Sequence, residues 1–153
     1  MIPPTGSDIE NDALEYLRVI NGETDSLVLA AFADADRALF RGDTLAARKG
    51  FTNLGEKGDG AAAEEAAWLD ATLALEQGDS TRIVSLARDR SGTPVAERAW
   101  LTLAEWQETN GHLNGAVKSL EELLLSDPEG LLAPIARLRH DRLVAELAAL
   151  QVK

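Results

Sequence analysis

The sequence predicts an all-α protein, and three observations carry that prediction. Alanine, leucine, glutamate and arginine, which favour helices, dominate the chain from residue 8 to its end. Glycine and proline fall mostly between segments with helical apolar periodicity, where turns are expected. No run of alternating apolar and polar residues is long enough to indicate a strand. With 153 residues, 45% of them hydrophobic, the chain can bury a substantial core.

Eight helices are expected in order along the chain. They span residues 8–20, 25–41, 44–55, 61–77, 80–89, 95–109, 113–126 and 130–150. The first, second, fourth and sixth are each followed by a glycine, which commonly adopts the left-handed conformation just after a helix. These glycines are Gly22, Gly42, Gly78 and Gly111. Thr93 and Pro94 supply an N-cap and a first-turn proline to the sixth helix, and Pro128 ends the seventh.

A pattern of helix end, glycine and polar residue occurs three times, at residues 38–43, 74–79 and 107–112. The three glycines are 36 and 33 residues apart. Helical repeats with a period of about 34 residues stack helix pairs that cannot bury their apolar faces alone. The spacing therefore predicts three repeated helix pairs. An irregular helical bundle with turns at similar spacing is the alternative.

The third unit carries the closest match to a known repeat. Its segment Trp100-Leu101-Thr102-Leu103-Ala104 has the tryptophan, leucine and alanine of a tetratricopeptide repeat opening, and Ala116, Leu120 and Pro128 follow at that family's spacing. The unit thus resembles a tetratricopeptide repeat. Ala104 and Ala116 are small where the two helices would cross. We expect Trp100 to be buried beside Leu103, Ala116 and Leu120.

The other two units resemble the repeat less closely. Ala35, Ala47 and Phe51 fit in the first unit, whereas Ile83 and Ala87 depart from the pattern in the second. The resemblance implies a right-handed α-solenoid of about three helix pairs with a capping C-terminal helix. We expect residues 1–24 to form an N-terminal arm or leading helix, and residues 25–150 to form the repeat domain.

Charge and composition argue against several functions. The chain has 15 lysines and arginines against 26 acidic residues, a net charge of −11, which disfavours nucleic acid. It has no cysteine and only two histidines, so we expect no metal site and no cofactor. Carboxylate pairs such as Glu105 and Glu108 fall on helix faces that we expect to be exposed to solvent. Catalytic carboxylates, in contrast, usually need burial. We therefore expect no enzyme activity.

One basic cluster interrupts this acidic chain. Arg137, Arg139, His140 and Arg142 lie within the last helix. The cluster could hold an acidic partner or a lipid headgroup, or it could pair with glutamates of the preceding helix. No apolar run approaches the roughly 18 residues of a membrane span, so no direct membrane insertion is expected.

The resemblance also implies a concave groove lined by the first helix of each unit. Partner-binding residues at its inner positions would be Phe32, Asp36, Glu65, Trp68, Thr72, Leu101, Glu105 and Glu108. Some tetratricopeptide domains clamp a carboxylate with lysine and asparagine at these positions, and this chain has apolar or acidic residues there instead. An apolar partner segment with flanking positive charge is the better complement.

We therefore expect a protein–protein interaction scaffold that binds a partner segment in this groove. The alternative is a non-catalytic structural or accessory subunit packed permanently in a larger complex, which could be associated with the cell envelope. A cytoplasmic location is the default expectation, with a periplasmic one if a signal or anchor was removed. The oligomeric state and the partner's identity stay open.

Overall fold

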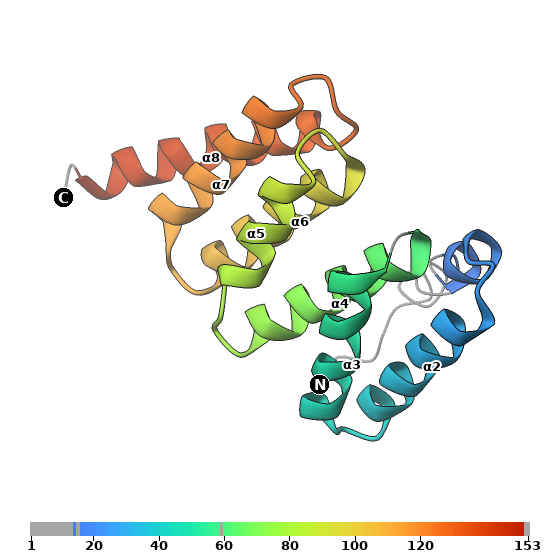
Figure 1. Ribbon diagram of the computed structural model, residues 1–153. Helices are drawn as coiled ribbons and strands as arrows, with labels where there is room; N and C mark the ends of the chain where they lie inside the picture. The colour runs from blue at the N-terminus through green and yellow to red at the C-terminus, as the bar shows by residue number, and fades with distance from the viewer. Residues whose placement is uncertain (1–13, 15, 59, 152–153) are drawn as a thin grey trace. The chain divides into compact units, whose positions relative to one another are not determined.

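The computed structural model describes residues 14, 16–58 and 60–151, and these are helical apart from short turns (Figure 1). The helices are α2 (Ser26–Phe40), α3 (Thr44–Lys57), α4 (Ala61–Glu76), α5 (Thr81–Asp89), α6 (Pro94–Thr109), α7 (Leu113–Ser126) and α8 (Ala133–Gln151). Residues 14 and 16–22 are helical as well. Within this part of the chain no strand occurs, so the all-α prediction is confirmed. None of the helices described has the length and apolarity needed to cross a membrane.

The three glycine turns share one conformation. Gly42, Gly78 and Gly111 have φ angles of 79°, 85° and 76°, a region in which a side chain would be strained. In each turn the residue after the glycine donates its backbone N–H to a carbonyl five residues earlier, at 2.9, 2.9 and 2.7 Å. This is the Schellman arrangement that satisfies the last carbonyls of a helix. The sequence pattern at these three sites therefore produces three equivalent turns.

Side-chain caps fix three of the helix starts. Asp25 accepts a hydrogen bond from the Leu27 N–H at 2.8 Å, and Asp43 accepts one from the Ala46 N–H at 3.1 Å. Thr93 accepts one from the Ala96 N–H at 3.3 Å, as its place before Pro94 predicts. Each bond satisfies an N–H that has no partner within its own helix.

The last helix begins three residues later than expected, at Ala133 instead of residue 130. Residues 127–130 form a turn closed by a hydrogen bond from the Gly130 N–H to the Asp127 carbonyl, at 3.3 Å. The buried Glu97 carboxylate then accepts the Leu132 N–H at 2.8 Å. A residue of α6 therefore sets this helix start, and it is 35 residues away in the sequence.

The described residues fall into two compact units, one ending at Leu73 and the other beginning at Ala74, with the division inside α4. The core of the first unit joins Val19, Phe32, Phe51 and Ala66. The Phe32 and Phe51 ring centroids lie 5.6 Å apart, and the Tyr16 ring meets Phe32 edge-on at 6.3 Å. Because Val19 is buried in this core, residues 16–22 pack as a leading helix. Residues 1–13 of the expected arm lie outside the described residues.

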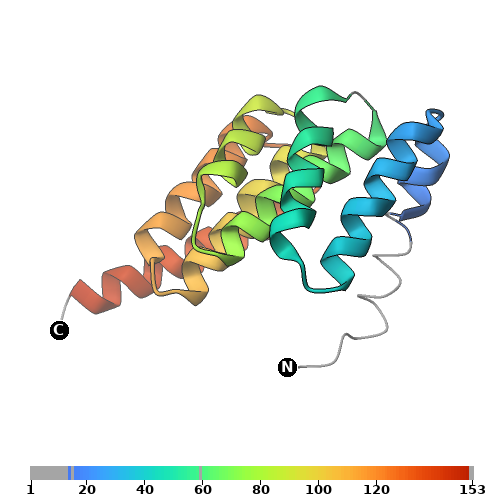
Figure 2. The same ribbon diagram turned by 60° about the horizontal axis from the view of Figure 1, so that its bottom comes forward.

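In the second unit, α6 packs against both α5 and α7, and α7 also packs against α8. Successive helices of this unit alternate in direction (Figures 1 and 2). Trp100 and Leu103 of α6 are buried, as are Ala116 and Leu120 of α7. The burial expected for Trp100 is therefore confirmed.

Helices α2 and α3 cross closely at Gly50, within the first unit. A Cβ atom at Gly50 would lie 2.7 Å from the Ala35 Cβ, closer than real Cβ contacts. The small residue that the resemblance predicts at position 35 is therefore matched by a glycine on the facing helix. Bulk at either position would push the helices apart.

We expect Gly50→Ala to lower the free energy of unfolding by about 1–3 kcal/mol, the usual cost of overpacking. Helix propensity alone predicts the opposite sign, a gain of about 1 kcal/mol. Gly115→Ala is the comparison variant, because its Cβ would meet the end of the Gln107 side chain, at 3.1 Å, and not a Cβ atom of the facing helix. Urea denaturation of both variants measures the difference. A stabilised Gly50→Ala protein would contradict the close crossing.

Candidate partner-binding site

Two of the expected binding anchors, Phe32 and Trp68, are buried. Their residues are only 4% and 7% exposed, respectively. Phe32 lies between Tyr16 and Phe51, so its ring belongs to the core of the first unit. The groove hypothesis requires exposed rings at these two positions, and neither ring is exposed. A binding role for Phe32 and Trp68 therefore stays a prediction.

The polar residues expected beside those anchors bond within the first unit. Asp36 accepts a hydrogen bond from the Tyr16 hydroxyl at 2.5 Å. Glu65 is buried and lies 3.4 Å from the Arg18 guanidinium. The Thr72 hydroxyl donates to the Trp68 and Leu69 carbonyl oxygens of its own helix, at 3.1 Å each. The polar atoms of these three side chains are therefore engaged within this unit.

The remaining three expected residues, Leu101, Glu105 and Glu108, lie on α6 in the second unit. Their spacing of four and three residues places them on one face of the helix. Leu101 is half-buried and Glu105 is exposed. Of the eight expected residues, Glu105 is the one that is exposed, and Glu108 is half-buried like Leu101.

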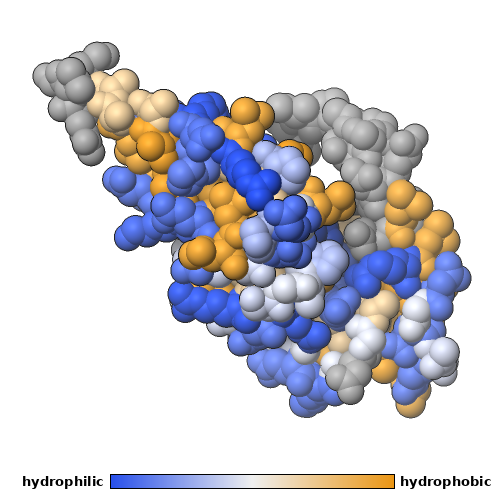
Figure 3. Space-filling view, turned by 90° about the horizontal axis from the view of Figure 1, so that it is seen from above, coloured by the Kyte–Doolittle hydropathy of each residue, from blue (hydrophilic) through white to orange (hydrophobic). Residues whose placement is uncertain are grey.

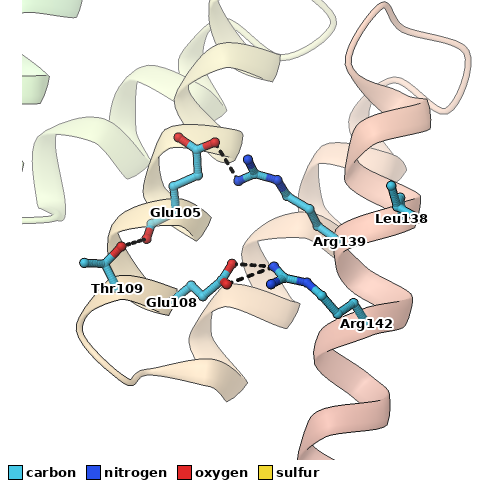
Figure 4. A pocket seen from close by; sticks show the side chains of 6 residues that line it. All are labelled: Glu105, Glu108, Thr109, Leu138, Arg139 and Arg142. Carbon is cyan, nitrogen blue, oxygen red and sulfur yellow. Dashed lines mark hydrogen bonds and ion pairs between the residues drawn. The ribbon is translucent and has the colours of Figure 1, made fainter. Parts of the chain in front are cut away.

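Helix α8 lies opposite this face and supplies two arginines to it (Figure 4). The Arg139 guanidinium is 2.5 Å from a Glu105 carboxylate oxygen. An Arg142 Nη donates to both carboxylate oxygens of Glu108, at 2.8 and 2.9 Å. The side chains are a third to a half exposed on average, so each pair contributes about 0–1 kcal/mol.

A cleft of about 840 Å³ opens between α6 and α8 around these ion pairs. Its lining consists of Glu105, Glu108, Thr109, Leu138, Arg139 and Arg142. Thr109 donates its hydroxyl to the Glu105 carbonyl at 2.9 Å and borders the cleft on the α6 side (Figure 4). On the α8 side Leu138 provides the apolar surface. The cleft volume is in the range of small-ligand pockets, but four of its six lining residues are charged and Leu138 is its one apolar residue.

The arginines of the cleft were visible in the sequence as part of the basic cluster. Their three-residue spacing equals that of Glu105 and Glu108, which is the signal that could have predicted the two parallel ion pairs. His140, from the same cluster, lies 3.6 Å from Glu121 of α7. The sequence interpretation placed the glutamate partners on the preceding helix. That holds for His140 alone, whereas Arg139 and Arg142 pair with glutamates of α6. Thr109 and Leu138 carried no such signal.

The described residues contain no group of three or more histidine, aspartate or glutamate side chains placed to hold a metal ion. Comparison with models of protein families, with curated proteins and with solved structures found no match to this chain.

Proposed function

We propose that this chain is a protein–protein interaction module, a right-handed α-solenoid of about three tetratricopeptide-like helix pairs with α8 as its cap. The three equivalent glycine turns support the repeat, because they recur at 36 and 33 residues with the same hydrogen bonds. Small residues at the α2–α3 crossing and the buried Trp100 support the same pattern in the first and third units.

The observation that carries the function is the cleft between α6 and α8. In the proposal, a partner segment lies along it and places an apolar side chain against Leu138. Basic side chains of the partner then approach Glu105 and Glu108. Because Arg139 and Arg142 already neutralise those carboxylates, the apolar contact contributes more to affinity than the charges do. The charges mainly set orientation and association rate.

The same geometry supports a non-catalytic role. A catalytic carboxylate usually lies in a shaped site that withholds it from solvent. Glu105 and Glu108 are instead paired with guanidinium groups and reached by solvent. We therefore propose that Glu105 and Glu108 bind a partner and do not take part in catalysis.

Blocking the cleft tests the proposal. Thr109 is exposed and lines the cleft, so Thr109→Arg should fill it and reduce partner capture by about 10-fold or more, which corresponds to about 1.4 kcal/mol. Asn114→Arg introduces the same charge at an exposed site of α7 outside the lining and should leave capture unchanged. The measurement is quantitative mass spectrometry of proteins retained by each tagged variant, with circular dichroism to verify the fold. Equal retention by both variants would contradict the cleft as the binding site.

A second candidate function is that of an accessory subunit packed permanently in a larger complex. The α2–α3 turn favours it, because Phe40 and Leu45 beside that turn are 93% and 83% exposed. Exposed apolar side chains of this size often mark a contact surface. A partner that is lost on Phe40→Glu and retained on Thr109→Arg would favour this second candidate over the cleft.

A further inference from the structure

The leading helix contacts three of the residues that the sequence predicts to bind a partner. The Tyr16 ring meets Phe32 edge-on, with the ring centroids 6.3 Å apart, and the Tyr16 hydroxyl donates a hydrogen bond to Asp36 at 2.5 Å. The Arg18 guanidinium lies 3.4 Å from Glu65. An aromatic ring and a cation of the chain itself therefore occupy the positions at which a partner is expected to place an apolar side chain and a positive charge.

Little buried surface holds this helix in place. Among its described residues, 14 and 16–22, Val19 alone is buried. The ion pair that Arg18 forms with Glu64, at 3.3 Å, is open to solvent, since the two side chains are 41% and 34% exposed. Exposed ion pairs contribute little to stability. A segment with one buried side chain opens at a lower free energy than the core that it covers.

The leading helix also exposes three large apolar side chains. Leu14, Leu17 and Ile20 are 64%, 52% and 57% exposed. Apolar side chains are visible in Figure 3 at the right of the view, where the leading helix and the start of α2 lie in Figure 1. A helix that stays on a protein surface usually turns a polar face to water. The seated position therefore covers only part of this helix's apolar surface, and Val19 and the Tyr16 ring are the main apolar groups that unseating returns to water.

The surface beneath the helix requires an occupant. With the leading helix seated, Phe32 is 4% exposed and the Glu65 side chain is 8% exposed. A carboxylate buried to this degree is destabilising without a positively charged partner, and an apolar ring is destabilising in water. A helix that takes the place of the leading helix must therefore present an apolar side chain to Phe32 and a cation to Glu65.

We propose that the leading helix is a removable seal over a binding surface for a partner helix. The surface consists of four side chains of α2 and α4, namely Phe32, Asp36, Glu64 and Glu65. The occupant that displaces the seal is a basic amphipathic helix of a partner protein. It carries an aromatic residue, an aliphatic residue three positions later and an arginine between them, as Tyr16, Val19 and Arg18 do. The proposal does not rest on the cleft between α6 and α8, because all of these residues belong to the first unit.

The seal makes binding conditional on its opening. Residues 23–25 join the leading helix to α2, so the helix competes with a partner as a tethered segment at high local concentration. The apparent affinity of the partner falls in proportion to the fraction of time for which the surface is open. A surface that is open for a tenth of the time binds about 10-fold more weakly than one without a seal.

Fluorescence anisotropy with a labelled peptide of residues 14–22 tests the seal. In the full-length Arg18→Glu protein, like charges face Glu64 and Glu65, so the leading helix should unseat, while the peptide keeps its arginine. The peptide should bind this variant at least about 10-fold more tightly than it binds the wild-type protein. So short a peptide is not stably helical in water, but this penalty is the same for both proteins and leaves the ratio unchanged.

Two controls show whether the charges act as proposed. Arg37→Glu changes the net charge equally, but Arg37 pairs with Asp34 along α2, so this variant should bind the peptide as weakly as the wild-type protein does. The same peptide with Arg18→Glu should lose its binding to the Arg18→Glu protein, because no cation then reaches Glu64 or Glu65. Equal affinity of the original peptide for the Arg18→Glu and wild-type proteins, or no binding to either, would overturn the proposal.

Hydrogen exchange of the wild-type protein measures the opening directly. The Glu23 N–H donates to the Val19 carbonyl at 3.0 Å, at the end of the leading helix, and should exchange at least about 10-fold faster than the Phe51 amide in the core of the same unit. Exchange of both amides at one rate would show that the helix is a permanent part of that core. Loss of protection throughout α2 and α3 in the Arg18→Glu protein would show the same. Either result contradicts a removable seal.

Discussion

Replacing Trp100 by alanine is expected to lower the free energy of unfolding by about 3–5 kcal/mol, the usual cost of truncating a large aromatic residue in a core. Trp100 is 5% exposed and lies on α6, which packs against both α5 and α7. The truncation would leave a cavity that the short side chains Ala104 and Ala116 cannot fill. Since small proteins are stable by about 5–15 kcal/mol, this loss is a large share of the total.

Trp106→Ala is the control for that experiment. Trp106 lies on the same helix but is only half-buried, with its ring 6.1 Å from the His112 ring. The Trp106→Ala substitution should lower the free energy of unfolding by clearly less, because less of the Trp106 surface is removed from water. Urea denaturation followed by circular dichroism measures both variants. A loss below about 1 kcal/mol for Trp100→Ala would show that the ring does not pack as the repeat register requires.

The helices could be predicted from the sequence because their ends are fixed locally. Gly42, Gly78 and Gly111 each adopt a left-handed conformation that other residues avoid, and Thr93 caps the helix that follows it. Such signals act within a few residues, so they can be recognised in the sequence without knowledge of the tertiary contacts. The start of α8 could not be predicted in this way, because it depends on Glu97 of α6.

The candidate site was harder to predict because it depends on contacts between distant residues. Glu108 and Arg142 are 34 residues apart, and only the packing of α6 with its neighbours brings them together. The burial of Phe32 likewise depends on Tyr16, which belongs to the leading helix and not to any repeat. A family resemblance gives helix order and approximate faces. It does not say which faces an extra N-terminal helix covers.

Trp68 is buried as well, at 7% exposed. An aromatic ring gains about 25 cal/mol for each Å² of apolar surface that it removes from water. When a neighbouring element offers cover, burial is favoured over exposure in a groove. Helix α4, which carries Trp68, contributes Ala62 and Ala66 to the core of the first unit.

Replacing Phe51 by alanine is expected to cost about 3–5 kcal/mol in the first unit, as Trp100→Ala does in the second. Phe51 is fully buried and its ring centroid lies 5.6 Å from that of Phe32. Phe40→Ala is the matched control, because this phenylalanine is almost fully exposed and its loss should change stability by less than about 0.5 kcal/mol. Thermal and urea denaturation give both values.

The pair Phe51→Ala and Trp100→Ala also tests the proposed solenoid. In a stacked array, stability is a sum of repeat terms and nearest-neighbour interface terms, so a weakened unit destabilises the one beside it. Hydrogen exchange should then accelerate in both units for either variant, because opening is shared across the array. If Phe51→Ala accelerates exchange only up to residue 73, and Trp100→Ala only from residue 74, the two units unfold independently and the continuous solenoid is wrong.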